Sequence, residues 1–310
     1  MGVKKWWQLV KDSASEWMND KAPRLGAALA YYTVFSIAPL LVLVIAVAGF
    51  VFGQDAVQGQ LAAQIQDLVG EQGAQAIQTM VAGASKPGSG IIATALSIIL
   101  LIVGAIGLFG ELQDALNTIW EVQPKPRSAL WGFLRERLLS FSMVLGSIFL
   151  LLVSLVISTI LTALASLWGD WQVSIIGHVL SVIGSLIVIT LLFAMIYRYL
   201  PDAKIAWSDV WLGAAVTAVL FTIGKFLIGL YLGRSSVSSA YGAAGSLAVL
   251  LIWLYYAAQI FLFGAEFTKV YADKYGSRIV PAENAEPVTD QARAQQGLPR
   301  TAGHPAGSPA

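Results

Sequence analysis

The sequence predicts an all-α, polytopic membrane protein with six transmembrane helices, and two observations carry this prediction. Of the 310 residues, 57% are hydrophobic and only 12% are charged, whereas soluble domains carry about 25% charged residues. The apolar residues are also gathered into long runs, and about 20 helical residues suffice to cross the roughly 30 Å hydrocarbon core of a bilayer. The expected spans are 25–52, 91–110, 139–163, 173–197, 209–232 and 246–266.

Residues 1–22 are predicted to form an amphipathic interfacial helix in front of the transmembrane domain, which we place at 23–276. Apolar residues recur there at spacings of three and four, while lysines occupy the other side. A short helix with tryptophan on one face and lysine on the other suits the membrane surface. The same apolar face equally suits packing on the protein's own helices, and the sequence leaves both alternatives open.

The first span, 25–52, is free of charge but polar in its first half, where Tyr31, Tyr32 and Ser36 lie, and Pro39 is near its middle. Proline removes a backbone donor and frees the carbonyl four residues earlier. In lipid that carbonyl needs another partner. We therefore expect a kinked helix whose polar side faces other helices.

The segments between and after the spans are more polar. Residues 53–90 are predicted to form one or two short surface helices, broken near Gly70 or Gly73. The second span carries glycines three residues apart, which allow helices to approach closely, and its helix is expected to continue into the polar residues that follow. The tail at 277–310 is rich in Pro, Ala, Gln, Glu and Gly, so we expect it to be disordered and cytoplasmic.

The distribution of basic residues predicts that both termini are cytoplasmic. With that orientation, 16 of the 19 Lys and Arg residues lie in cytoplasmic segments, and only Lys86 and Arg234 lie in outer loops. Cytoplasmic loops of membrane proteins carry an excess of Lys and Arg. An even number of spans agrees with this orientation.

A few polar residues inside the spans suggest a substrate path, because a charge at membrane depth is a functional hypothesis by default. Lys225 either forms a cationic site for an anionic group such as a phosphate head or extends its stem to the interface. Gln259 is expected to hydrogen-bond to neighbouring helices, whereas Glu266 and Lys269 are expected to form a surface pair. The candidate path residues are Tyr31, Tyr32, Ser36, Pro39, Lys225 and Gln259.

A polar cluster is predicted at the cytoplasmic boundary after the second span. Glu111 and Asp114 are three residues apart and share a helix face with Asn117 nearby. We expect these carboxylates to pair with Arg135 or Arg137. A metal site is the weaker hypothesis, because two carboxylates without histidine make a poor ligand set.

Signatures of enzymes are missing from the chain. The sequence contains no Walker-type phosphate loop, no HExxH, no GxSxG and no cysteine. The net charge of +1 gives no global basic field for nucleic acid. We therefore expect a protein without enzymatic activity, metal, cofactor or nucleic-acid partner.

Three stretches of the chain resemble the YihY/virulence factor BrkB family. The first is ALAYYTVFSIAPLL in span one, and the second is ELQDALNTIWEVQPKPR after span two. The third runs from YRYLPD through WSDVWLGAAVTAVLFTIGKFLIGLYL to YGAAGSLAVLLIWLYYAAQIFLFGAEFTKVYA. Together they cover most of residues 20–275.

The resemblance implies a multi-pass protein of the bacterial cytoplasmic (inner) membrane, in a family whose members are labelled virulence or serum-resistance factors. It favours transporter-like handling of lipid or another envelope component, with membrane lipids as partners. A scaffold that recruits envelope-assembly proteins is the alternative. An older family label, ribonuclease BN, implies a remote third function that these residues do not support. The sequence does not indicate an oligomeric state.

Overall fold

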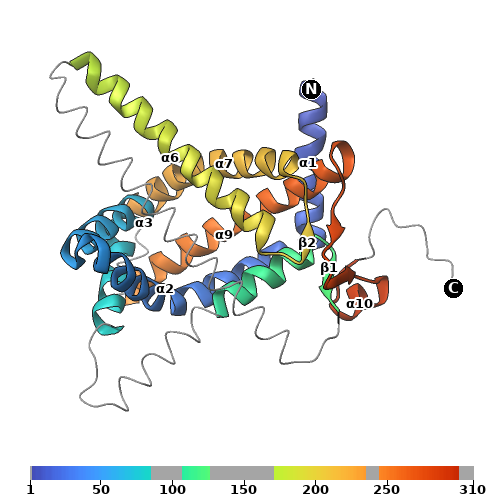
Figure 1. Ribbon diagram of the computed structural model, residues 1–310, viewed down its shortest axis with the longest axis horizontal. Helices are drawn as coiled ribbons and strands as arrows, with labels where there is room; N and C mark the ends of the chain where they lie inside the picture. The colour runs from blue at the N-terminus through green and yellow to red at the C-terminus, as the bar shows by residue number, and fades with distance from the viewer. Residues whose placement is uncertain (1, 85–106, 126–170, 235–243, 300–310) are drawn as a thin grey trace, which may run out of the picture.

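A computed structural model describes residues 2–84, 107–125, 171–234 and 244–299 of the chain, and most of these residues are helical. The long helices run along the length of the molecule, whereas α1 crosses their direction at one end (Figure 1). The long helices are α2 (Ala22–Phe52), α3 (Gln54–Ala84), α6 (Trp171–Tyr199), α7 (Trp207–Arg234) and α9 (Gly245–Tyr275).

Four of the described helices, α2, α6, α7 and α9, are long and apolar enough to cross a membrane. They coincide with the first, fourth, fifth and sixth predicted spans. The predicted span at 139–163 lies outside the described residues, as does 91–110 apart from its last four positions, which are helical and continue as one helix over 107–119. The side of the membrane on which the termini lie stays a prediction.

Helix α2 differs from the expectation that its polar side faces other helices. The helix continues through Pro39 to its end at Phe52. Ser36 is buried, but Tyr31 and Tyr32 are exposed. The buried stripe of α2 instead follows the small and aliphatic residues Ala30, Val34 and Ala38. Because these residues allow a closer approach than phenol rings do, much of each tyrosine is left exposed, and only an edge of the Tyr32 ring lies against Gly107 of the 107–119 helix.

Helix α9 is the centre of the fold and packs against α1, α2, α3 and α7. Two glycines allow α7 and α9 to approach closely. A Cβ atom on Gly264 would lie 1.9 Å from Oγ1 of Thr217, and one on Gly213 would lie 1.8 Å from Oγ1 of Thr268. Each helix therefore places a threonine over a glycine of the other, an arrangement typical of helices that pack within membranes.

Helix α3 occupies the opposite end of the molecule from the C-terminal residues (Figure 1). It consists of two segments that meet at Gly70, where φ is +76° and ψ is 173°. That conformation is open to glycine and costly for other residues. The predicted break near this position is therefore confirmed, whereas one side of α3 packs against α2 and α9.

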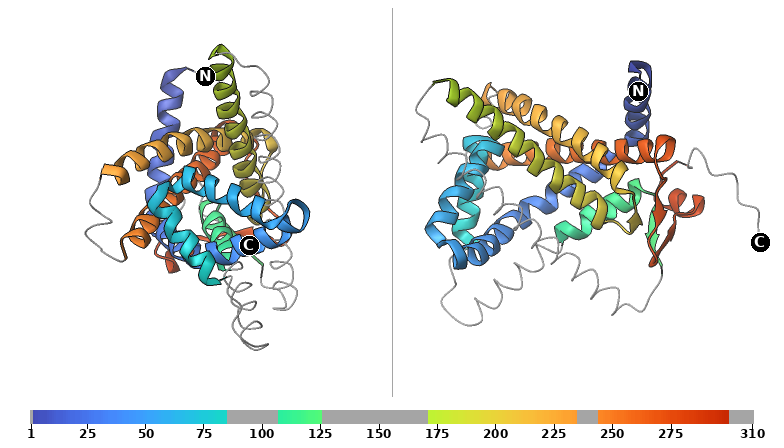
Figure 2. Two further views of the ribbon diagram at one scale, coloured as in Figure 1. Left: turned by 90° about the vertical axis from the view of Figure 1, so that its left-hand side faces the viewer. Right: turned by 45° about the horizontal axis from the view of Figure 1, so that its top comes forward.

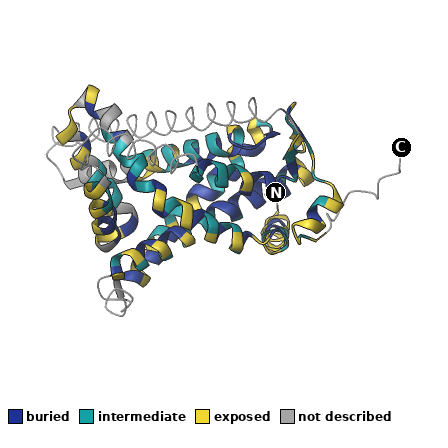
Figure 3. Cartoon of the chain, turned by 90° about the horizontal axis from the view of Figure 1, so that it is seen from below, coloured by how far each residue is buried: buried dark blue, intermediate teal, exposed yellow. Residues whose placement is uncertain are grey.

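Helix α1 (Val3–Asn19) runs across the long helices and is seen end-on in Figure 3. Part of α1 packs on the protein: Leu9 is buried, and the partly exposed Trp6 ring stacks on Phe267 of α9 with centroids 5.9 Å apart. The rest of the apolar face, including Trp7 and Met18, is exposed. The packing alternative thus holds for Leu9 and Trp6, whereas contact of the exposed residues with the membrane surface stays a prediction.

The tail after residue 277 was expected to be disordered, but the structure folds it as far as residue 299. Its backbone pairs with two interhelical loops in antiparallel strands, and this pairing supplies order that composition does not reveal. The elements are β1 (Val122–Pro124) paired with β4 (Ala285–Pro287), β2 (Ala203–Lys204) paired with β3 (Val280–Pro281), and α10 (Asp290–Gln295). We call this end of the molecule, formed by α1, the four strands and α10, the capped end (Figure 2).

Candidate functional site

The capped end contains five charged side chains that come from four separate parts of the chain, and we call them the ionic network. Asp20 follows α1, Glu121 follows the helix at 107–119, Glu266 and Lys269 belong to α9, and Arg293 belongs to α10. Their relative exposures are 0% for Glu266, 1% for Asp20, 2% for Arg293 and 7% for Lys269. Such residues are almost never fully buried unless they are paired.

Each base in the ionic network bridges the same two acids. The Arg293 guanidinium lies 2.6 Å from Oδ1 of Asp20 and 3.4 Å from Oε1 of Glu121. The Lys269 Nζ lies 2.7 Å from Oε1 of Glu121 and 3.9 Å from Oδ2 of Asp20. These contacts tie the N-terminal helix, α9 and the tail to one point.

Acids outnumber bases in this region. Glu266 lies within electrostatic range of Asp20 and of Glu16 of α1. Burial raises the pKa of Glu16, which also lies near Lys269, Asp20, Glu121 and Arg293. Three buried carboxyl oxygens, Oδ2 of Asp20 and both oxygens of Glu266, accept no hydrogen bond from the described residues.

The expectation that Glu266 and Lys269 form a surface pair is wrong. Both are buried, and Lys269 pairs with Glu121 and Asp20 instead. The physical reason is that α9 continues past the predicted end of the span at 266 to Tyr275, and α1 and the tail cover this extension.

A second polar centre at the capped end surrounds Asp202, and we call it the Asp202 centre. Its Oδ2 accepts hydrogen bonds from Gln113 Nε2 (3.0 Å) and Asn117 Nδ2 (3.1 Å), and its Oδ1 accepts one from Asn284 Nδ2 (2.6 Å). The backbone N–H of Asp202 donates to Oδ1 of Asn117 at 2.8 Å. Neutral amides thus supply donors to both carboxylate oxygens.

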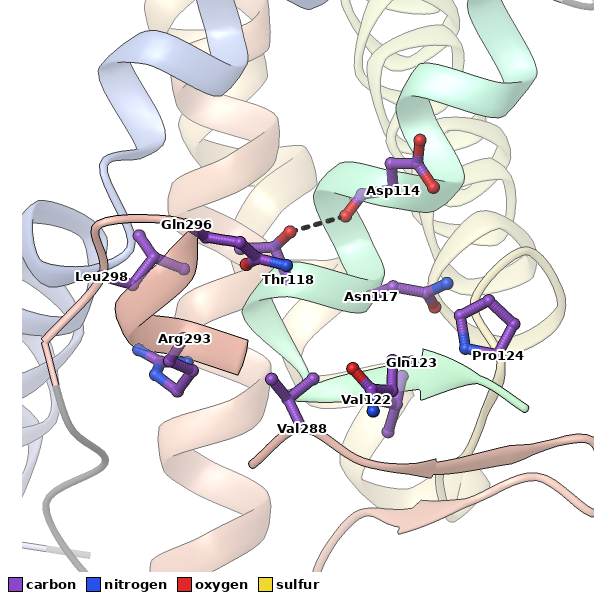
Figure 4. A pocket seen from close by; sticks show the side chains of 10 residues that line it. All are labelled: Asp114, Asn117, Thr118, Val122, Gln123, Pro124, Val288, Arg293, Gln296 and Leu298. Atoms are coloured by element: carbon purple, nitrogen blue, oxygen red, sulfur yellow. Dashed lines mark hydrogen bonds between the residues drawn. The ribbon is translucent and has the colours of Figure 1, made fainter. Parts of the chain in front are cut away.

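Two cavities flank the ionic network. The larger, of about 720 Å³, lies between α1, α9, Glu121 and the tail strands, and Lys269 lines it. The smaller, of about 340 Å³, is lined by Arg293 and by residues of the 107–119 helix (Figure 4). In that view the hydroxyl of Thr118 donates to the backbone carbonyl of Asp114.

The predicted cytoplasmic polar cluster is found in part. Asp114 and Asn117 line the smaller cavity, and Asn117 also belongs to the Asp202 centre. Glu111 is half-buried on the same helix. Arg135 and Arg137 lie outside the described residues, so the predicted pairing with them stays a prediction.

The predicted substrate path is not brought together around either cavity, since both are lined by other residues. Lys225 is half-buried on α7. The Gln259 amide lies against α2, where a Cβ atom on Gly26 would be 2.0 Å from its Nε2. Both amide atoms are buried without a hydrogen-bond partner among the described residues, so the expected hydrogen bonds of Gln259 are not formed there.

The sequence analysis did not single out Asp20, Glu121 or Arg293. The one local signal for Arg293 is Thr289, whose hydroxyl accepts a hydrogen bond from the Ala292 N–H and thereby caps α10. Threonine directly before a helical segment is a typical N-cap residue. No local pattern indicates that this short helix is attached to Asp20, which lies 273 residues away.

Comparison with known proteins identifies the family. A family model described as virulence factor BrkB matches residues 13–289. The chain belongs to the BrkB family. The BrkB match includes Asp20, Glu121 and Glu266 of the ionic network but ends before Arg293.

Similar curated proteins are named UPF0761 membrane proteins. One from Glaesserella parasuis is 28% identical over 241 residues, which cover 74% of this chain and 80% of the relative. One from Ralstonia nicotianae is 29% identical over 255 residues, which cover 80% of this chain and 55% of the relative. One from Pseudomonas aeruginosa is 25% identical over 253 residues, and the match covers 60% of that relative. This BrkB chain thus spans little more than half of the latter two proteins. No solved structure matches it.

Proposed function

We propose that this protein handles lipid or another amphiphilic envelope component in a transporter-like manner in the bacterial inner membrane. The observation that supports this proposal is the larger cavity at the capped end. Its volume of about 720 Å³ falls in the range of about 300–1,000 Å³ that is common for ligand pockets. It is lined by residues of α1, of the last turns of α9, of the turn after the 107–119 helix and of the tail.

The lining of this cavity suits a molecule with an anionic head and an apolar body. Lys274 and Arg278 supply positive charge beside the acidic side chains of Asp12, Glu16, Glu121 and Asp273, and Trp120, Ile279 and Val280 supply apolar surface. Lys274 is paired with Asp12 of α1, so an anionic head would compete with Asp12 for this ammonium group. Arginine binds phosphate oxygens through two parallel N–H donors.

The position of α1 supports a site at the depth of the lipid head groups. Its exposed apolar half, with Trp7 and Met18, is typical of a helix that lies in the membrane interface. The excess of Lys and Arg in loops on the side of the termini favours the cytoplasmic leaflet. A lipid head could therefore enter the cavity without leaving its leaflet.

The test uses the full chain in liposomes that contain labelled phosphatidylglycerol. We expect the double variant Lys274→Ala/Arg278→Ala to bind this lipid at least about tenfold more weakly, because losing even one charge-assisted contact costs about 1.5 kcal/mol. Movement of label between leaflets should fall in parallel. The matched control is Lys11→Ala, which removes an exposed charge of α1 outside the cavity. Wild-type protein that neither binds nor moves the lipid would overturn the proposal.

A scaffold that recruits envelope-assembly proteins is the second candidate function, and one observation favours it. Helix α3 exposes a polar face, which includes Gln58, Gln66, Glu71 and Gln78, at the end away from the capped end. Specific crosslinks from this face to an envelope protein, together with absence of lipid movement, would favour the scaffold over the transporter-like function.

A further inference from the structure

The side chains of Asp20 and Glu266 are buried neighbours in the interior of the capped end. Glu266 is 0% exposed and Asp20 is 1% exposed. Among the described residues, no donor reaches either oxygen of Glu266 or Oδ2 of Asp20. A buried carboxylate without a donor is costly, and two adjacent carboxylates strongly disfavour simultaneous ionisation.

The neighbouring bases do not supply the missing donors. The groups that act electrostatically on Glu266 are Asp20 and Glu16 from α1 and Lys269 from α9 itself. Arg293 donates to the other oxygen of Asp20. The Lys269 ammonium bonds to Glu121 of the neighbouring turn and stays 3.9 Å from Asp20.

The small positive species that fits between these two carboxyls is a proton. Within the part of the chain that the structure describes, no group of three or more acidic or histidine side chains is suited to hold a metal ion. A proton needs only the two carboxyls, because one donates its O–H and the other accepts. That hydrogen bond would satisfy Oδ2 of Asp20 and one oxygen of Glu266 together.

We propose that Asp20 and Glu266 form a proton-binding site that holds α1 and the tail closed on α9. Asp20 lies at the corner between α1 and α2, where Lys21 adopts φ of +54°. Release of the proton to water leaves two buried anions facing each other across the contact between this corner and α9. Repulsion then separates them, and α10 moves with Asp20 through Arg293. This site does not require the larger cavity to bind lipid.

Infrared difference spectroscopy of the full chain in nanodiscs tests the site directly. We expect the wild-type protein at neutral pH to show a protonated carboxyl stretch that Glu266→Gln abolishes. The control Glu71→Gln removes an exposed carboxylate of α3 and should leave the band unchanged. Absence of the band in the folded wild-type protein, or its persistence in Glu266→Gln, would overturn the proposal.

Hydrogen exchange of α1 amides tests whether the bound proton holds α1 against α9. In Glu266→Gln the amide N–H can donate to Asp20 in place of the proton, so closure should no longer depend on pH. Relative to this variant, opening of wild-type α1 should rise by about tenfold per pH unit between the titration midpoints of the open and the closed form, where opening releases one proton, and should level off above the midpoint of the closed form. Asp20→Asn serves the same purpose if the first variant fails to fold. The proposal would be contradicted if α1 exchange depended on pH in the same way in wild type and variant. It would also be contradicted if increasing Na⁺ concentration slowed α1 exchange to a plateau, because the site would then bind Na⁺ instead of a proton.

Discussion

The capped end contains two buried carboxyl centres that join distant segments in opposite ways. Both oxygens of Asp202 accept hydrogen bonds from neutral amides of Gln113, Asn117 and Asn284. In the ionic network, by contrast, acids outnumber bases, and three carboxyl oxygens accept no hydrogen bond from any residue that the structure describes. A fully hydrogen-bonded polar network makes one arrangement rigid. A partly hydrogen-bonded network keeps buried polar groups whose desolvation is not compensated, so binding of a donor to them is favourable. We therefore infer that the Asp202 centre stabilises one arrangement of the capped end, whereas the ionic network changes its arrangement when it gains or loses a proton.

The Asp202 centre also gives a physical role to two stretches that carry the family resemblance. Gln113 and Asn117 belong to ELQDALN, and Asp202 ends YRYLPD. These stretches meet because the helix at 107–119 and the loop after α6 converge on one carboxylate. Asn284 then brings the tail to the same carboxylate.

The largest expected effect comes from removing the satisfied carboxylate. Asp202→Ala leaves several buried amide donors without an acceptor, and each orphaned group costs about 1–3 kcal/mol. We expect the free energy of unfolding to fall by about 4 kcal/mol, measured by denaturation in detergent micelles. The control Lys204→Ala removes a neighbouring exposed ion pair with Glu283 and should cost less than about 1 kcal/mol. Equal losses in the two variants would contradict the stabilising role of the Asp202 centre.

A smaller effect on the global free energy of unfolding is expected from Arg293→Ala, because its loss is confined to the tail. This change leaves Asp20 buried without its closest cation, and breaking a buried ion pair costs about 3–5 kcal/mol. Because α10 is short and terminal, the loss should appear mainly as local release of the tail. Amides of residues 277–299 should exchange faster, while those of the 107–119 helix stay protected. The matched variant Arg293→Lys keeps the charge but cannot bridge Asp20 and Glu121 equally well, so its exchange should be intermediate.

The smallest expected effect is a dependence of the free energy of unfolding on pH, which arises from Glu16 beside the ionic network. Burial raises the pKa of Glu16 above its ordinary value of 4.5, so the folded protein binds this proton more tightly than the unfolded chain does. The resulting stability is complete below pH 4.5 and is lost as the pH rises through the raised pKa. Because Glu16 is half-buried, we expect a loss below about 1 kcal/mol.

Unfolding measured across this pH range in wild type and Glu16→Gln checks the prediction. The variant cannot release the proton, so its profile should be flatter than that of the wild type. A wild-type profile that rises with pH in this window, after correction by the variant, would contradict the assignment.

The apolar helices could be predicted from the sequence because the signal for a span is local. A run of about 20 apolar residues suffices to identify a helix that can cross a bilayer, and α2, α6, α7 and α9 follow such runs. The break at Gly70 is equally local, since glycine is favoured where φ is positive.

The tail and the ionic network could not be predicted because their stabilising contacts are distant in sequence. The composition after residue 277 favours disorder, and only pairing with β1 and β2 orders it. Glu266 and Lys269 stand three residues apart, a spacing that favours a surface pair on an isolated helix. Whether such a pair is exposed depends on which other elements pack against α9, and the spacing of residues along α9 does not indicate them.

The distance of 273 residues between Asp20 and Arg293 has a consequence for biogenesis. The acids Asp20 and Glu121 leave the ribosome well before either base, Lys269 or Arg293, has been made. A nascent chain therefore carries these carboxyls without their counter-ions. The ionic network is completed only when α10, which contains Arg293, emerges. Chains that stop after α9 would contain the long helices but lack the ion pair between Arg293 and Asp20, which joins the tail to α1.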